Sequence, residues 1–216
     1  MARSPRITIP AYPHHIIQRG NNRSATSLPM MATRLFGMSS PSQNQMSIQD
    51  LRVLMTNHFH LLVEPAKIGD LDRFMQSAGR RYVRYINETA DRSRTLWDGR
   101  LKTAPVSRDE YLSACSRYIE LNPLRAGLVE HPKDYRWSSY QRCGLGVSDR
   151  LLDDDPWYTG LGTTEQERQE EYRQWTDSQV NQANGTKSDR QRNAVAWSEK
   201  NLSKTDRRND LTTISR

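Results

Sequence analysis

Two histidines separated by a single residue are the side chains of this sequence best suited to bind a metal ion. His58 and His60 lie in an otherwise apolar stretch. Successive side chains of a strand point to opposite faces, so the two imidazoles would share one face while Phe59, Leu61 and Val63 face the core. A lone histidine here would be better explained as a satisfied, buried polar group. The pair favours ligation, because neutral imidazole is the commonest metal ligand among side chains.

A tyrosine and an asparagine form a second candidate pair. Ser107 and Glu110 match a capping box, which predicts the start of a helix. Tyr118 and Asn122 are four residues apart, so they would share one helix face with their tips close together. Asn122 also fits the first position of a new helix because Pro123 follows it, and Tyr118 also fits a half-buried helix aromatic. Both interpretations stay open. The buried side of this helix is expected to be Tyr111, Leu112, Cys115 and Ile119.

Arginines gather on one side of another predicted helix. Apolar residues recur with helical period from Leu71 to Ile86 and predict an amphipathic helix, in which Tyr82 fits the core better than a base-stacking role. A stripe of charge is commonly only a solvated face. Without interleaved acids, a role in following a phosphate backbone is equally well supported. The arginines are Arg73, Arg80, Arg81 and Arg84.

Two strands are expected to carry the histidines of the chain. Residues 6–19 alternate loosely and predict a first strand, and the strand with the paired histidines is expected from about Leu51 to Val63. His14 and His15 are adjacent, so they face opposite sides and cannot both join one metal site. Polar strand positions or phosphate contacts explain each of them better.

The composition limits the class of protein. The chain has 216 residues, 35% of them hydrophobic, and a mean hydropathy of -0.88, which fits one domain with a modest core and an appendage. A net charge of +7 favours a polyanionic partner, although a basic chain alone is weak evidence. Cys115 and Cys143 form neither a disulfide framework nor a zinc ribbon. Reduced thiols and the lack of a long apolar segment predict a cytoplasmic protein without a membrane span.

The chain divides into a body and a charged extension. Residues 1–146 are expected to form the main domain, 147–175 a C-terminal extension with a short charged helix over 163–175, and 176–216 a disordered tail. Residues 24–53 are atypical because no helical or strand period can be traced there, and the stretch is long for a connection. We interpret it as disordered, frame-shifted or decayed.

Five blocks of sequence resemble one family. They are 55–62, 79–87, 96–100, 117–127 and 135–140. In this order they resemble the REP-associated tyrosine transposases, single-tyrosine HUH nucleases related to insertion-sequence-200 type transposases. The resemblance covers roughly 1–23 and 54–146. Residues 24–53 depart from the family, in which a helix and a strand would be expected at that place.

The resemblance implies a ferredoxin-like α+β domain, an α/β fold in the broad sense, whose antiparallel sheet carries the His-x-His strand opposite the tyrosine helix. It implies a substrate of single-stranded or hairpin DNA, the repetitive extragenic palindrome, and no small-molecule substrate. Tyr118 would be the nucleophile, and His58, His60 and Asn122 would hold Mg or Mn. We expect a monomer. The basic residues expected to contact DNA are Arg19, Arg73, Arg80, Arg81, Arg84, Arg100, Lys102, Arg117 and Arg125.

The chemistry implied is strand transfer through a covalent intermediate. The divalent cation would polarise the scissile phosphate, and the Tyr118 phenolate would attack phosphorus to give a 5′-phosphotyrosine and a free 3′-hydroxyl. A phenol, with an ordinary pKa of about 10, needs help at neutral pH, and the cation would supply it. Two imidazoles are soft ligands for Mg, so phosphate oxygens would complete the shell.

Two other functions fit parts of this pattern. A nucleic-acid-binding protein without catalysis, such as a decayed transposase, would use the same arginines and aromatics. A hydrolase with a metal-activated water would leave Tyr118 incidental. The first predicts that Tyr118→Phe leaves function intact, and the second predicts multiple turnover without a protein-DNA adduct.

Overall fold

A four-stranded sheet forms the centre of the computed structural model, which describes residues 8–21, 46–89, 91, 95–107, 111–149, 152–153 and 156–184. The strands are β1 (His14–Arg19), β2 (Met46–Leu54), β3 (His58–Pro65) and β4 (Lys102–Pro105). Their order is β2-β3-β1-β4, and every neighbouring pair is antiparallel. This order and the helix between β3 and β4 agree with the expected ferredoxin-like α+β arrangement. The segment between β1 and β2, residues 22–45, lies outside the described residues.

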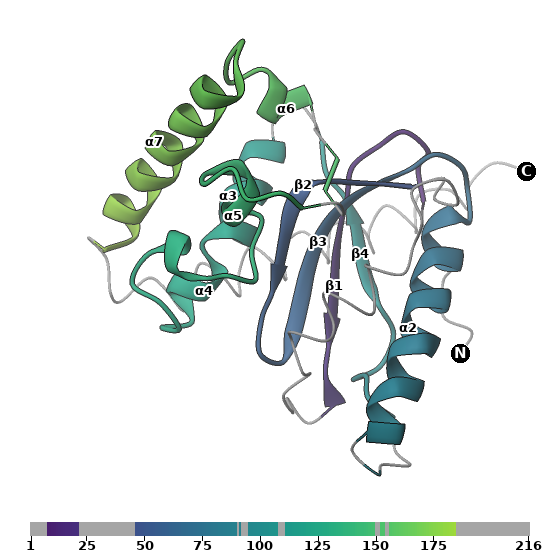
Figure 1. Ribbon diagram of the computed structural model, residues 1–216. Coiled ribbons are helices and arrows are strands. Elements are labelled where there is room, and N and C mark those ends of the chain that lie inside the picture. Colours follow the sequence, from purple (N-terminus) through teal and green to yellow (C-terminus); the bar gives the residue numbers. More distant parts are fainter. Residues whose placement is uncertain are drawn as a thin grey trace, which may run out of the picture.

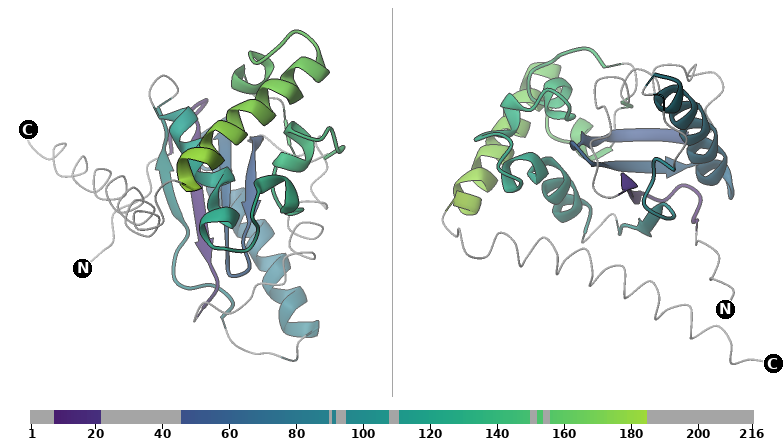
Figure 2. Two further views of the ribbon diagram at one scale, coloured as in Figure 1. Left: turned by 90° about the vertical axis from the view of Figure 1, so that its left-hand side faces the viewer. Right: turned by 90° about the horizontal axis from the view of Figure 1, so that it is seen from below.

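Helices cover both faces of the sheet (Figures 1 and 2). One face carries the long helix α2 (Asp70–Thr89), and the other carries α3 (Leu112–Glu120) and the elements that follow it. Among the described residues, none of these helices is both long and apolar enough to cross a membrane. The elements after α3 are α4 (Asn122–Arg125), the 3₁₀ turn η4 (Pro132–Asp134), α5 (Tyr140–Cys143), α6 (Pro156–Thr159) and α7 (Glu165–Asn184).

The alternation of β3 divides its side chains between the two layers, as its sequence predicts. Phe59, Leu61 and Val63 are fully buried in the core under α2, whereas Leu62 joins the core under α3. β1 pairs with this strand so that His58 lies opposite Arg19. Because directly paired residues share a face, the register of β1 against β3 decides which β1 side chains meet the histidines.

Helix α2 forms as its periodicity predicts. Leu71, Ala78, Tyr82 and Ile86 are its buried hydrophobic residues, so the core role of Tyr82 is confirmed. The helix begins directly after Gly69, whose φ of +86° suits glycine. Two carboxylates in its first turn place negative charge beside the positive end of the helix dipole. This interaction stabilises a helix that begins at this point.

The expected single strand over 51–63 was wrong. The chain turns at Thr56 and Asn57, where the Met55 amide donates to the His58 carbonyl over 2.8 Å, and the two halves pair as β2 and β3. Part of the atypical stretch 24–53 therefore supplies a strand of the sheet. β2 is irregular between Ile48 and Arg52, where the register shifts against β3.

Two expected details of the helices were also wrong. The capping box of Ser107 and Glu110 is not tested, because Glu110 lies outside the described residues, and α3 as described begins at Leu112 with Tyr111 as N-cap. Tyr111 is 43% exposed and so is not part of the buried side, which Leu112, Cys115 and Ile119 supply. The charged helix α7 continues to Asn184, past its expected end at 175.

The C-terminal helices pack around the end of α3 (Figure 1). Tyr140, Tyr158 and Tyr172 are buried and form an aromatic cluster that joins α5, α6 and α7. A smaller cluster places Val180 of α7 against Leu124 of α4. Helix α7 therefore braces the segment that follows α3. The two cysteines of the chain are buried and are not joined by a disulfide.

A buried carboxyl connects α3 to this C-terminal unit. Glu120, the last residue of α3, is fully buried and accepts a 2.9 Å hydrogen bond from the Ser139 hydroxyl. Burial raises the pKa of Glu120 to about 7, against hydrogen bonds from Ser139, Tyr172 and Ser138 that favour its charged form. The carboxyl is therefore held neutral in mildly acid solution, where it would be ionised in the unfolded chain.

This carboxyl should make the stability of the fold depend on pH. A pKa that is higher in the folded state stabilises the fold at low pH, and the effect is lost as pH rises towards 7 and above. Glu120→Gln should remove that loss. The free energy of unfolding of the variant, relative to that of wild type, should therefore increase by on the order of 3 kcal/mol from pH 5 to pH 8. Urea unfolding at the two pH values measures it.

Glu130→Gln, at an exposed position, serves as the control for removing one negative charge. A Glu120→Gln variant whose stability relative to wild type is the same at both pH values would contradict the assignment.

Candidate active site

The two histidines of β3 face α3 at one end of the sheet. His60 is buried and His58 is half-buried, and their ring centroids lie 4.9 Å apart. They are adjacent on one face because they flank Phe59, which points to the other layer. The strand therefore brings together the two imidazoles as the sequence predicts.

Each of these histidines uses its Nδ1 atom within the protein. The His58 Nδ1 donates to the Asn57 Oδ1 over 2.6 Å, and the His60 Nδ1 lies 2.9 Å from the His15 Nε2. The His60 Nε2 is buried and has no hydrogen-bond partner among the described residues. An unpartnered buried ring nitrogen beside a second imidazole suits a cation.

His15 is a component of this cluster that the sequence interpretation missed. It is a polar residue of a strand, as expected, but its buried ring faces His60 and meets the Tyr118 ring at 6.1 Å. The opposite orientation of His14 was predicted correctly, because the His14 Nδ1 bonds the Tyr12 carbonyl instead. Only the register of β1 against β3 could have identified His15. In that register His15 pairs with Leu62, which lies on the same face of β3 as His60.

Helix α3 places Tyr118 against the histidines. The Tyr118 and His60 ring centroids are 5.7 Å apart with the rings nearly perpendicular. α3 lies this close because Cys115 and Ile119, on the same side of the helix, are fully buried against the sheet. The candidate residues of two distant motifs thus meet on one face.

Asn122 lies one turn beyond Tyr118, as its spacing predicts. It is the first residue of α4, and its amide nitrogen donates to the Tyr118 carbonyl over 2.9 Å. With the nitrogen engaged in this way, the amide oxygen is the atom left for a cation. Within the described residues, no three side chains of the His, Cys, Asp and Glu types converge to hold a metal ion, so a site here would need this oxygen or a ligand from the substrate.

Burial and nearby cations act in opposite directions on the Tyr118 phenol. Burial raises its pKa, and a hydrogen bond from Asn122 and the charges of Arg125 and Arg19 lower it. The Arg125 guanidinium lies 5.6 Å from the centre of the Tyr118 ring. The protein alone therefore favours the neutral phenol, and a further positive charge would be needed to favour phenolate.

The histidines are held uncharged. Burial lowers the pKa of His58 to about 4, with a contribution from the Arg19 charge, and lowers the pKa of His15 to about 3. Burial also lowers the pKa of His60 well below its ordinary value. Neutral imidazole is the form that binds a metal. At neutral pH the cluster consequently keeps its ring lone pairs.

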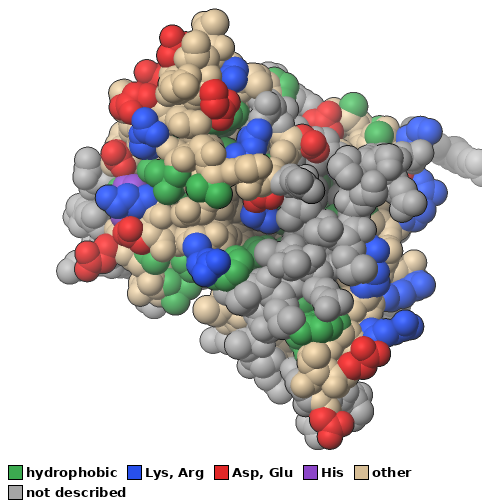
Figure 3. Space-filling view, in the orientation of Figure 1, with side chains coloured by type: hydrophobic (Ala, Val, Ile, Leu, Met, Phe, Trp, Pro, Cys, Tyr) green, Lys and Arg blue, Asp and Glu red, His purple; other side chains and the backbone are tan. Residues whose placement is uncertain are grey.

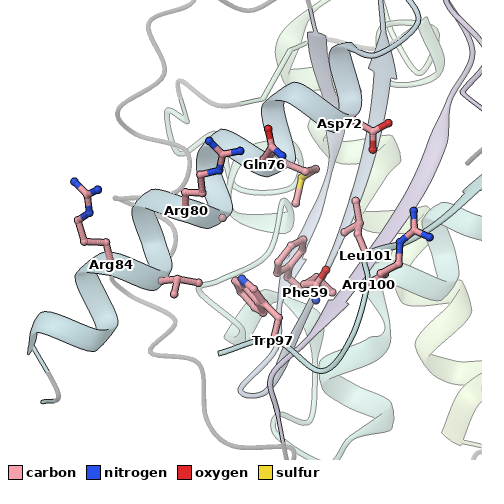
Figure 4. A pocket seen from close by; sticks show the side chains of 12 residues that line it. Phe59, Asp72, Gln76, Arg80, Arg84, Trp97, Arg100 and Leu101 are labelled. Carbon is pink, nitrogen blue, oxygen red and sulfur yellow. The ribbon is translucent and has the colours of Figure 1, made fainter. Parts of the chain in front are cut away.

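A pocket of about 810 Å³ lies on the opposite face of the sheet, between α2 and the segment before β4 (Figure 4). Phe59 and Trp97 form its aromatic centre, with ring centroids 5.9 Å apart. Arg80 and Arg84 border it from α2, and Arg100 borders it from the other side. An aromatic surface between guanidinium groups suits a ligand that combines flat rings with phosphates.

The basic residues predicted to contact DNA fall into three groups. Arg80, Arg84 and Arg100 border the pocket, and Lys and Arg side chains gather along the α2 side of the molecule (Figure 3). Arg19 and Arg125 act on Tyr118, and Arg117 is close enough to Arg125 for their charges to interact. Arg73 pairs with Asp70 over 2.6 Å, whereas Arg81 and Lys102 are exposed.

Trp97 and Gln18 were not among the predicted site residues, although both line the pocket. Trp97 belongs to the sequence block 96–100, which was a signal for it. Gln18 had none, because its place depends on its pairing with Phe59 across the sheet.

Comparison with known proteins places this geometry in context. A family model described as "Transposase IS200 like" matches residues 10–122, just over half of the chain, including both β3 histidines, Tyr118 and Asn122. The fold is similar to a structure described as a REP-associated tyrosine transposase bound to a REP hairpin, with a TM-score of 0.56 and 16% sequence identity. That similarity covers 72% of this chain and 93% of the other. No curated protein matches the sequence.

Removing the cation beside Tyr118 should raise the pKa of its phenol further. Arg125→Met keeps much of the side-chain volume but removes the charge that favours phenolate. Titration of ¹³C-labelled tyrosine by NMR measures the change. Arg136→Met is the matched control, because Arg136 stacks on Trp137 and is not among the charges acting on Tyr118. An unchanged Tyr118 titration in Arg125→Met would contradict the assignment.

Proposed function

The chain belongs to the family of IS200-like transposases, and from this we propose that it cuts and rejoins single-stranded DNA with Tyr118 as nucleophile. The observation that carries the proposal is the position of the Tyr118 ring, 5.7 Å from an uncharged His60 whose Nε2 has no hydrogen-bond partner in the described part of the chain. A phenol beside neutral imidazoles fits a nucleophile that acts next to a bound cation.

We assign the cation to Mg or Mn, held by His58, His60 and the Asn122 oxygen. The fit rests on the two Nδ1 atoms being engaged by Asn57 and His15, which leaves both Nε2 atoms for ligation. When bound, the cation supplies the positive charge that favours phenolate and withdraws electron density from the scissile phosphate. Phosphate oxygens of the DNA would supply its further ligands, because oxygen is the ligand that Mg prefers.

The residues of the chain then have separate roles in the reaction. Tyr118 loses its proton and forms a bond from its oxygen to phosphorus, while the bond to the 3′-oxygen breaks and that oxygen takes up a proton. The products are a 5′-phosphotyrosine and a free 3′-hydroxyl. Arg19 and Arg125, whose charges already favour the phenolate, attract the phosphate to the same place. Because one phosphodiester replaces another, the 3′-hydroxyl of a strand can reverse the step without ATP.

The pocket under α2 holds another part of the same DNA in this proposal. Trp97 offers a stacking surface, and Arg80, Arg84 and Arg100 neutralise phosphates around it. The pocket and the histidines occupy the same end of the sheet on opposite faces, since Phe59 lies between His58 and His60. A strand that reaches both sites passes around that end, where Arg19 is exposed.

We propose a DNA hairpin with single-stranded flanks as the substrate. The similar structure is described as bound to a REP hairpin, and that description supports a hairpin here. We propose that the protein acts as a monomer in the cytoplasm.

Substitution of the nucleophile should abolish the covalent product while DNA binding remains. Purified protein is incubated with Mn and a 5′- or 3′-labelled hairpin oligonucleotide, and the products are separated on a denaturing gel. Wild type should give a protein-linked band with the label on the 3′ side of the cut, and Tyr118→Phe should give none. Tyr111→Phe, at an exposed tyrosine of the α3 N-terminus, is the matched control and should keep the adduct.

The alternatives give different results in the same assay. Hairpin binding by wild type without any adduct would contradict catalysis and support a non-catalytic binding protein. Cut DNA with multiple turnover and no adduct, in both wild type and Tyr118→Phe, would support a hydrolase.

The α2 arginines should contribute to affinity through phosphate contacts. Arg84→Ala should weaken hairpin binding and reduce the slope of log K against log salt by roughly 0.7–0.9, the value for one phosphate contact. Fluorescence anisotropy across a salt series measures both quantities. Arg168→Ala on α7, where Arg168 pairs with Glu165, is the matched control and should leave the slope unchanged. An Arg84→Ala slope equal to that of wild type would place the DNA elsewhere.

A further inference from the structure

His15 and His60 are joined by a hydrogen bond whose geometry is well defined. The His15 Nε2 and His60 Nδ1 atoms are 2.9 Å apart, and the ring planes differ by 18°. The ring centroids are 5.2 Å apart. This distance is close to the sum of the nitrogen separation and the distance from each nitrogen to the centre of its own ring. The two nitrogens therefore lie on the line that joins the rings, where an N–H and a lone pair point directly at each other.

This pair shares a single proton between its facing nitrogens. Both side chains are buried, with exposed fractions of 5% for His15 and 1% for His60, and at a separation of 2.9 Å one of the two facing nitrogens must donate and the other must accept. A neutral imidazole carries one N–H and one lone pair. Either His15 donates and His60 carries its proton on Nε2, or His60 donates from Nδ1 and its Nε2 keeps a lone pair.

Only the second arrangement leaves His60 able to bind a cation. The His60 Nε2 is buried without a hydrogen-bond partner among the described residues, so an N–H at this atom would point at no acceptor there. His58 already has the matching arrangement, because its Nδ1–H donates to the Asn57 Oδ1. Donation by His60 gives both histidines of β3 the same tautomer.

We propose that His15 is a positioning residue that accepts the His60 Nδ1–H and thereby directs the His60 Nε2 lone pair towards the metal. The inference rests on the proposed function, because it assumes that the histidines of β3 hold the cation. Partners of this kind orient metal-binding histidines and make them better ligands. β1 supplies the acceptor from a second strand, so the ring of His60 is fixed by the sheet register and not by its own strand alone.

The tautomer can be measured directly in metal-free wild-type protein. Long-range ¹H–¹⁵N NMR spectra separate protonated from unprotonated ring nitrogens, and the His60 signals are identified by their loss in His60→Gln. We expect His60 to be protonated on Nδ1. A proton on the His60 Nε2 in the wild type would overturn the proposal.

Two variants of His15 then test what the acceptor contributes. His15→Phe keeps a ring beside His60 and Tyr118 but removes the acceptor, and it should weaken Mn binding about 10- to 100-fold, measured by calorimetry or EPR. His15→Gln, whose side-chain oxygen reaches about as far as the imidazole Nε2, should restore most of that affinity. His14→Gln is the matched control on the opposite face and should bind Mn like wild type.

The results separate this inference from the proposed function. Wild-type protein that binds no Mn contradicts the metal site itself and with it the role of His15. If folded His15→Phe binds Mn as tightly as wild type, the role of His15 is overturned and the metal site is not. If His15→Phe does not fold, as judged by its thermal unfolding, the wild-type tautomer and His15→Gln decide the question.

Discussion

The alternation of side chains along β3 is the constraint on which the rest of this structure depends. Three consecutive residues face two layers: His58 and His60 meet α3, whereas Phe59 lies in the core under α2 and lines the pocket. A shift of one residue in this strand would bury the imidazoles under α2 and direct Phe59 at Tyr118. The pairing of β1 extends the same division, placing His15 and Arg19 with the histidines and Gln18 with the pocket.

The position of Tyr118 depends on packing at both sides of α3. Cys115 and Ile119 fix the helix against the sheet, and the buried Glu120 joins its last turn to Ser139. Helix α7 packs on α4, which follows α3 directly, through Val180 and Leu124. The C-terminal extension therefore contributes to the geometry around the nucleophile, although it lies beyond the matched family region.

The local features of this chain were predictable from sequence, and the long-range ones were not. Periodicity identified α2 with its buried Tyr82, alternation identified the two faces of β3, and helical spacing placed Asn122 beside Tyr118. The turn at Asn57 was missed although the polar residues Thr56 and Asn57 separate the two apolar runs, because neither glycine nor proline marks the boundary. His15 and Gln18 were missed because their roles come from pairing between β1 and β3, a register that no local pattern specifies.

The measurement that tests this account most directly asks whether one DNA molecule engages both faces of the sheet. Protein carrying a photo-crosslinking benzoylphenylalanine in place of Gln76, at the pocket, is allowed to react with a hairpin oligonucleotide and Mn and is then irradiated. Mass spectrometry of the digest should find one DNA strand attached both to Tyr118 and to position 76, and no attachment when the crosslinker replaces Gln174 on α7. DNA linked to Tyr118 that is never crosslinked at position 76 would contradict a shared path around the end of the sheet.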